Sequence, residues 1–169
     1  LRLERVPFEA EPLDAFETTS GGKTRVVASP RASDRLVEEA LLAAVRRAVE
    51  PRLAPGVHGY RRGRSTFTAA IAAWKGLVSG RCEVLMTDVA AFYDSVDRER
   101  LSSQLAELLP AGVVRILAGL LSAPYSLHGR ITERPRGIPP GRVLSPILAI
   151  PAMSLSSVSG PRLATGGSS

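Results

Sequence analysis

The stretch Glu83–Asp94, EVLMTDVAAFYD, decides what this chain of 169 residues can be. Its apolar run predicts a buried strand over 83–89. Asp88 ends that strand, and a buried carboxylate is costly unless it is paired, hydrogen-bonded or bound to a cation. A carboxylate beside the main-chain carbonyl of Val89 suits Mg²⁺, which prefers oxygen ligands and takes others from water and phosphates. The stretch predicts a divalent-cation site or, in the structural alternative, a strand end followed by a helix cap at Asp94.

Two helices are predicted on the N-terminal side of this strand, because apolar residues recur there every three or four positions. The first follows Ser33 or Asp34 and stops at Pro51, and the second follows the cap Ser65 and ends at Gly80. The side chains expected to be buried are Leu36, Val37, Ala40, Leu41, Ala44, Val45 and Ala48 on the first helix and Phe67, Ala70, Ile71, Trp74, Leu77 and Val78 on the second.

Three more helices are expected on the C-terminal side of the strand. One begins near Asp94 or Ser95, with Val96, Leu101, Leu105 and Leu108 as its core face, and one covers 113–121. The last begins at Ser145, with a proline at its first position. Pro151 is expected to interrupt it, because proline removes a hydrogen bond inside a helix.

Strands are expected over 23–28 and in a hairpin over 125–132 that turns at His128 and Gly129. Residues 1–22 are acidic and loop-like, and end in a turn. The fold class is therefore α+β, with several helices packed on a small antiparallel sheet.

Three parts of the chain differ in composition. An acidic lead-in covers 1–22, a mixed domain covers 23–150, and a tail over 151–169 is rich in Ser, Gly and Pro. The tail is expected to be disordered or aberrant.

The charge of the chain predicts a polyanionic partner. The net charge is +6, and residues 23–64 carry ten cations against four anions. The alternative is that an Arg-rich composition reflects a GC-rich genome and solvated faces. No apolar run is long enough for a membrane span, and one cysteine, Cys82, cannot form an internal disulfide, so a cytoplasmic setting is expected.

Two groups of cations are candidate binding residues. Lys23 and Arg25 share one face of a predicted strand and could hold a polyphosphate, although cations on an edge strand are often only solvated. Arg61, Arg62 and Arg64 lie in one glycine-containing loop and suit a nucleic-acid backbone, unless the loop is simply solvent-facing.

The loop Gly137–Gly141 is a further candidate, because its glycines let the backbone approach a ligand and its prolines stiffen it. It could also be only a tight connection. His58 and His128 have no Ser or Cys nucleophile context, so a hydrolytic triad has little support.

Taken in order, the segments 22–35, 59–65, 88–94 and 137–149 resemble prokaryotic reverse transcriptases, of the group II intron type above all, with retron, diversity-generating and defence-associated relatives as other members. The resemblance covers about residues 20–149. It implies the fingers and partial palm of a right-hand polymerase that copies an RNA template from a DNA primer and dNTPs with two Mg²⁺ ions.

The resemblance also implies individual roles. Asp88, with Val89, would bind the catalytic Mg²⁺, and the ring of Tyr93 would lie beneath the sugar and exclude a 2′-hydroxyl. The loop after Arg136 would lie along the nascent base pair, and the arginine loop would contact nucleic acid. The implied dNTP-binding residues are Lys23, Arg25, Phe92, Tyr93, Gly137, Pro139 and Gly141.

Two departures limit the resemblance. Pro140 stands where the family has Gln, which removes a side-chain contact to nucleotide or template. No acidic residue follows Glu133, so the Tyr-x-Asp-Asp turn that supplies the second catalytic carboxylate is missing. Truncation or a frameshift is the simplest explanation, and a palm sheet without its later strands is expected to expose an apolar face.

Two functions remain open at this point. The first is an RNA-directed DNA polymerase domain that is incomplete and inactive as it stands. The alternative is a non-catalytic, maturase-like RNA-binding module or a relic of such an enzyme. The sequence does not decide the oligomeric state, the template or the priming mode.

Overall fold

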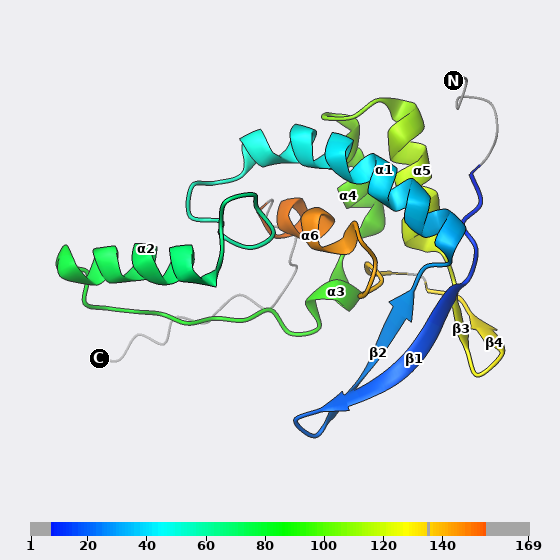
Figure 1. Ribbon diagram of the computed structural model, residues 1–169, viewed down its shortest axis with the longest axis horizontal. Coiled ribbons are helices and arrows are strands. Elements are labelled where there is room, and N and C mark those ends of the chain that lie inside the picture. The colour runs from blue at the N-terminus through cyan, green and yellow to red at the C-terminus, as the bar shows by residue number, and fades with distance from the viewer. Residues whose placement is uncertain (1–7, 135, 155–169) are drawn as a thin grey trace, which may run out of the picture.

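The computed structural model describes residues 8–134 and 136–154. Its described part contains six α-helices, one 3₁₀ helix and four strands, so the α+β class is confirmed (Figure 1). In chain order the elements are β1 (Leu13–Ser20), β2 (Lys23–Ser29), α1 (Ala32–Val49), η1 (Glu50–Arg52), α2 (Thr66–Val78), α3 (Phe92–Ser95), α4 (Arg98–Ala106), α5 (Ala111–Ser122), β3 (Tyr125–Leu127), β4 (Arg130–Thr132) and α6 (Ser145–Ser154).

The sheet has the order β2-β1-β3-β4. β1 pairs antiparallel with β2 and parallel with β3, so the sheet is mixed and the expected all-antiparallel sheet is wrong in this one pairing. The loop-like interpretation of residues 13–20 is also wrong, because they form β1 and bury Leu13 completely. The turns after Ser20 and at His128 are confirmed.

Helix α1 buries part of the predicted face, with Val45 in the core and Val37, Leu41 and Ala48 packed partly buried against it, but the buried face also includes acidic residues that were not predicted. Leu36 is 72% exposed, whereas Asp34 and Glu38 are buried together with Val45 and Val49. Apolar spacing missed these acidic residues because hydrogen bonds compensate their burial: the amide of the partly buried Glu11 donates to Asp34 at 3.0 Å. Arg31 occupies the N-cap without a side-chain cap bond, so neither Ser33 nor Asp34 is the cap.

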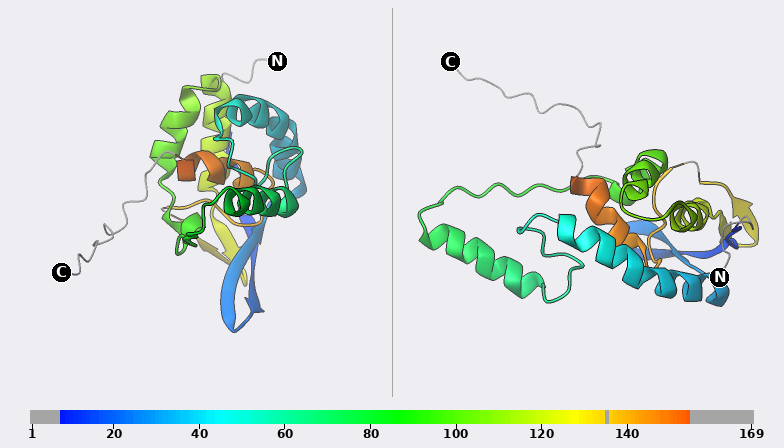
Figure 2. Two further views of the ribbon diagram at one scale, coloured as in Figure 1. Left: turned by 90° about the vertical axis from the view of Figure 1, so that its left-hand side faces the viewer. Right: turned by 90° about the horizontal axis from the view of Figure 1, so that it is seen from above.

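The core lies among α1, α4, α5 and α6. Figure 2 shows α6 between α1 on one side and the α4–α5 pair on the other. Leu101 and Leu105 of α4, as predicted, and Leu117 and Leu120 of α5 are each 1% exposed. α5 corresponds to the helix predicted over 113–121.

A buried ion pair crosses this core. The Nε of Arg142 donates to Glu38 at 2.5 Å, and both side chains are almost fully buried. Arg142 also donates to the carbonyl of Leu120, and the amide of Leu144 donates to Glu38 at 3.3 Å. The pair therefore fastens α1 to the end of α5 and to the start of α6.

Pro151 does not end α6, which continues through it to Ser154. Pro151 and Ala152 are buried, as are Ile147 and Leu148 one turn earlier. Burial of this apolar segment outweighs the hydrogen bond that a proline removes. The expected tail begins within the helix, and its residues 155–169 lie outside the described residues.

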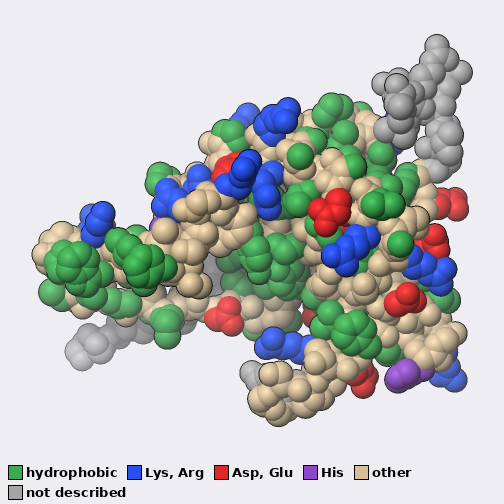
Figure 3. Space-filling view, viewed as in Figure 1, with side chains coloured by type: hydrophobic (Ala, Val, Ile, Leu, Met, Phe, Trp, Pro, Cys, Tyr) green, Lys and Arg blue, Asp and Glu red, His purple; other side chains and the backbone are tan. Residues whose placement is uncertain are grey.

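Helix α2 is correctly predicted, with Ser65 as its cap in a reciprocal capping box with Thr68, but its burial is not. It extends away from the other helices, and none of its residues is buried (Figures 1 and 2). Figure 3 shows hydrophobic side chains open to solvent along it. Phe67 and Trp74 are 73% and 60% exposed.

The predicted buried strand over 83–89 is wrong as well. This segment is extended but unpaired, and Leu85 and Met86 are 86% and 93% exposed. A strand needs a neighbour for its backbone groups, and the described residues contain no strand that pairs here. Apolar side chains are thus exposed on α2 and on this unpaired segment, whereas the apolar face was expected on a sheet. Among the described helices, none combines the length and the apolar character needed to cross a membrane.

Candidate functional site

An open groove of about 620 Å³ brings together segments that lie far apart in the sequence. One wall comes from the loop before α2, one from the extended segment before α3, one from α3 itself and one from the C-terminal half of α6. The lining residues are Val57, Gly59, Tyr60, Thr87, Asp88, Val89, Phe92, Tyr93, Ala149, Ile150 and Met153. Four of the predicted site residues, Asp88, Val89, Phe92 and Tyr93, thus lie in one groove.

Asp88 is exposed, so the buried carboxylate expected from the sequence is corrected to a carboxylate at an open groove. Its Oδ1 accepts a hydrogen bond from the amide of Val89 at 3.0 Å. Water can solvate this carboxylate, so it does not need a cation or a buried donor as its partner.

The groove offers few donors for a metal ion. Asp88 is the one acidic residue among its lining residues, and Val89 adds a carbonyl oxygen of the kind that Mg²⁺ accepts. No three His, Cys, Asp or Glu side chains gather into a possible metal site anywhere in residues 8–134 and 136–154. A centre with two ions needs more ligands than this, so the described residues do not fit one by themselves.

The aromatic residues of α3 are fixed by packing. The rings of Phe92 and Tyr93 meet edge to face, with centroids 5.5 Å apart. Burial raises the pKa of Tyr93, and the charge and hydrogen bond of the Tyr60 hydroxyl raise it further. Ala91, before the helix, has a left-handed φ of 47°, which turns the chain from the extended segment into α3.

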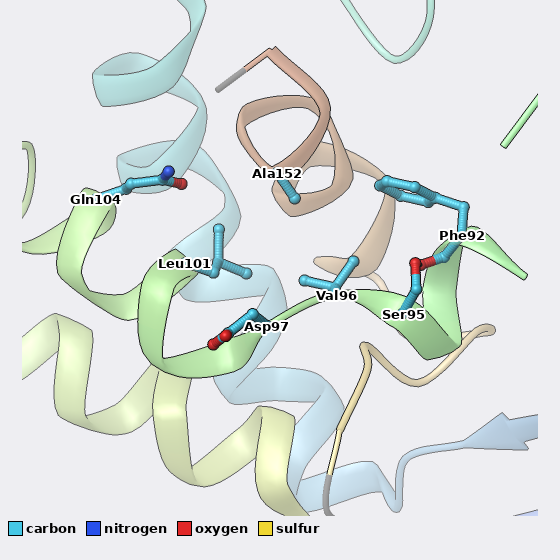
Figure 4. Close-up of a pocket in the computed structure, with 7 residues that line it drawn as sticks. All are labelled: Phe92, Ser95, Val96, Asp97, Leu101, Gln104 and Ala152. Carbon is cyan, nitrogen blue, oxygen red and sulfur yellow. The ribbon is translucent and has the colours of Figure 1, made fainter. Parts of the chain in front are cut away.

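Phe92 also borders a second cavity, which lies between α4 and the C-terminal part of α6 (Figure 4). This cavity has about 20 Å³ and is lined by Val96, Leu101 and Ala152 among others. Such a volume holds about one water molecule. The larger groove is therefore the candidate site.

The loop Gly137–Gly141 forms hydrogen bonds both to α3 and to strand β2 of the sheet. The amide of Ile138 donates to the carbonyl of Tyr93 at 2.7 Å, and the amide of Ala28 in β2 donates to the carbonyl of Pro140 at 3.0 Å. Gly137 and Pro139 are buried and Gly141 is exposed. The loop therefore holds the segment after Asp88 and the strand of Arg25 in a fixed relation.

The two glycines of this loop approach protein backbone. Gly137 has φ +84°, and a Cβ there would lie 2.6 Å from the carbonyl oxygen of Tyr93. Gly141 has φ +101°, and its Cβ would lie 2.4 Å from the carbonyl oxygen of Ala28. The tight connection left open by the sequence is thus present, and contact with a ligand stays a prediction.

The cations of β2 lie in the arm of the β1–β2 hairpin. Arg25 pairs with Thr18 across the hairpin and is exposed, but it does not line the groove. Lys23 pairs with Ser20, and its side chain lies outside the described part. The structure thus does not bring Arg25 together with Asp88 in the groove.

The three arginines of the loop before α2 differ in their contacts. Arg61 donates from Nη1 to the carbonyls of Ala54 and Val57, at 3.0 and 3.4 Å, and so fixes the loop. Arg62 and Arg64 are exposed. Figure 3 shows Lys and Arg side chains gathered over the end of α1 and this loop.

Sequence reasoning missed several residues that hold the site. Arg98 donates from Nε to the carbonyl of Gly137 at 2.7 Å, and burial lowers its pKa. Arg142, which directly follows the loop Gly137–Gly141, pairs with Glu38 and so ties the end of this loop to α1. The helical spacing of Asp34, Glu38 and Val45 was a usable signal for Glu38, whereas nothing local marks Arg98 or Arg142.

Comparison with known proteins gives one informative similarity. The chain is 30% identical, over 151 residues, to an uncharacterized 91 kDa protein in a cob intron of Schizosaccharomyces pombe. This alignment covers 88% of the chain and 18% of the yeast protein. No family model matches the chain. The chain is therefore related in sequence to an intron protein, and it spans less than a fifth of that relative.

Proposed function

We propose that this chain is the fingers and partial palm of an RNA-directed DNA polymerase, similar to the reverse transcriptases of group II introns. The observation that carries the proposal is the groove in which Asp88 and Val89 lie beside Phe92 and Tyr93. Those four residues belong to the segment that most resembles the polymerase palm. The similarity to a cob intron protein supports the same origin.

The chemistry would be transfer of a nucleotide from a dNTP to a primer 3′-hydroxyl on an RNA template. During this transfer, the ring of Tyr93 would contact the sugar of the dNTP. The ring packs against Phe92, and in that position it would exclude a 2′-hydroxyl. Arg25 of β2, which does not line the groove, and Lys23 on the same strand would contact the triphosphate. Arg62 and Arg64 would contact phosphates of the template.

Mg²⁺ would supply charge neutralisation at the phosphates, but the groove has one carboxylate where two ions need several ligands. We therefore assign no reaction step to the described residues alone. The chain by itself is expected to bind nucleic acid and to incorporate no dNTP.

The test uses a longer polypeptide in which a Tyr-x-Asp-Asp segment follows this region. Extension of a DNA primer on an RNA template should require Mg²⁺ and should be lost in Asp88→Asn, because the carboxylate at the groove is neutralised. RNA binding should persist in that variant, since Asp88 is not part of the arginine loop. Primer extension by Asp88→Asn at the wild-type rate would contradict the proposal.

A non-catalytic, maturase-like RNA-binding module is the second candidate. The exposed arginines beside a groove with one carboxylate favour it. A steep fall of RNA affinity with salt fits both candidates, because phosphate contacts release counterions in either case. If the extended polypeptide binds RNA but never incorporates dNTPs with Mg²⁺ present, the second candidate is correct.

A further inference from the structure

We propose that Tyr60 is a base-stacking residue, whose ring binds a nucleobase of single-stranded nucleic acid at the groove that contains Asp88. This assignment rests on the proposed function and deepens it, since it gives the nucleic-acid surface a contact to bases in addition to phosphates. Four observations support it.

The backbone of Tyr60 is in a conformation that favours glycine. Its φ is +56°, one of three positive φ values at non-glycine residues in the described part of the chain. Such conformations carry strain and persist where the surrounding structure holds them, often at binding sites. Gly59 and Gly63 lie in the same loop, so a tyrosine at the strained position points to a use for its side chain.

The side chain of Tyr60 lies at the groove and is largely open to solvent. It lines the groove, and its hydroxyl interacts with that of Tyr93 on the facing element. Tyr60 nevertheless remains 59% exposed. An aromatic ring that lines a groove and keeps most of its surface open is suited to stacking on a flat ligand.

The loop that carries Tyr60 is held in place before any ligand binds. Arg61 donates to the carbonyls of Ala54 and Val57, and His58 hydrogen-bonds Thr68 in the first turn of α2 at 2.9 Å. Less ordering is therefore required of the protein when a base stacks on the ring.

The charge around Tyr60 identifies the class of ligand. Residues 46–64 contain six arginines and one glutamate, a net charge of +5. Arg62 and Arg64, on the same loop, are exposed. An exposed aromatic ring among cations is the combination that binds single-stranded nucleic acid, with the cations on the phosphates and the ring on a base.

The test measures binding of the full chain to a fluorescein-labelled oligoadenylate RNA by fluorescence anisotropy. Tyr60→Gly removes the ring and also relieves the strained φ. It should weaken binding about tenfold at every salt concentration, since stacking does not release counterions. Its resistance to urea should be equal to or higher than that of the wild type. Tyr60→Phe should bind nearly as well as the wild type, because it keeps the ring.

Trp74→Ala is the matched control. Trp74 is 60% exposed, almost as much as Tyr60, but lies on α2 outside the groove, so its removal should leave RNA affinity unchanged. Arg62→Ala should weaken binding and lower the salt dependence by about one counterion, which separates phosphate contacts from stacking.

A probe without bases identifies the contact itself. An abasic oligonucleotide should bind wild type and Tyr60→Gly equally, and 2-aminopurine in the RNA should be quenched by wild type and much less by Tyr60→Gly. Equal RNA affinity of wild type and Tyr60→Gly would overturn the stacking role and leave the proposed function intact. Absence of RNA binding by the wild type would instead count against the proposed function.

Discussion

Helices α2 and α5 are both rich in apolar residues, yet one is exposed and the other is buried. In α5, Leu117 and Leu120 are each 1% exposed, and the helix packs against α4. In α2, Phe67 is 73% exposed and no residue is buried. An apolar pattern therefore predicts that a helix forms and which of its sides avoids water, but the pattern does not contain the surface that covers that side.

The same contrast separates larger regions. The core region of α1, α4, α5 and α6 is tied together by the buried pair of Glu38 and Arg142 and by the loop Gly137–Gly141. In the extended region, which consists of α2 and residues 81–89, the structure describes no buried ion pair, and most apolar side chains are exposed to solvent. Stability should therefore depend on the core region, and substitutions of the exposed apolar residues of α2 should change stability little.

Arg142→Met should have the largest effect on stability. It leaves the fully buried carboxylate of Glu38 without its cation and the carbonyl of Leu120 without its donor. Removing one partner of a buried pair costs about 3–5 kcal/mol. Urea unfolding followed by circular dichroism measures the loss.

The double variant Glu38→Gln with Arg142→Met should be more stable than Arg142→Met alone, because no unpaired charge then remains in the core. Arg31→Met is the surface control, since Arg31 pairs with Glu11 at 2.8 Å in solvent and should contribute little. A loss in Arg142→Met no greater than in Arg31→Met would show that the buried pair does not hold the core region together.

Leu117→Ala and Leu77→Ala compare α5 and α2 directly. The two substitutions remove the same atoms from a helix, at sites that are 1% and 46% exposed. Leu117→Ala should cost about 2–5 kcal/mol because it opens a cavity in the core, and Leu77→Ala less than about 1 kcal/mol. Equal losses in urea unfolding would mean that α2 is covered in solution.

Gly141→Ala should have an intermediate effect. Its left-handed backbone costs about 1–2 kcal/mol in alanine, and the crowding against Ala28 adds about 1–3 kcal/mol. Gly129→Ala is the matched control, since Gly129 also has a positive φ, +77°, but no neighbour within 4 Å of its Cβ. The difference between the two variants in urea unfolding measures the close approach of the loop to β2. No difference would remove the loop from the contacts that define the core region.

Local patterns predicted most of the elements. The capping residue Ser65, the hairpin turn at His128 and the proline-led start of α6 at Ser145 are encoded within a few residues, and all three are confirmed. Those signals depend on the chain's own backbone and hold whatever surrounds them.

Burial and the site depended on residues far apart in the chain. Glu38 is buried because Arg142, more than one hundred positions later, pairs with it. Residues 83–88 are exposed because the described chain provides no strand beside them. The segment of Asp88 and Tyr93 was predicted as one site, but Tyr60 joins it only through the folded loop before α2.

Tyr93 lies where the two regions meet, and its titration should show how far burial extends. Burial raises the pKa of Tyr93 above 10, and the Tyr60 hydroxyl acts in the same direction. The phenol therefore favours folding below pH 10, and this contribution is lost as the pH rises through the raised pKa, because the unfolded chain ionises first. This is the smallest of the predicted effects on stability, since Tyr93 is only half-buried. Absorbance at 295 nm, taken as the difference between wild type and Tyr93→Phe, should give a transition above pH 10 in buffer and near pH 10 in urea.

The variant Tyr60→Phe tests the second cause of the raised pKa. It should move the transition of Tyr93 in the folded protein to lower pH, because the Tyr60 hydroxyl no longer raises the pKa. An unchanged transition in Tyr60→Phe would mean that the two hydroxyls do not interact in solution.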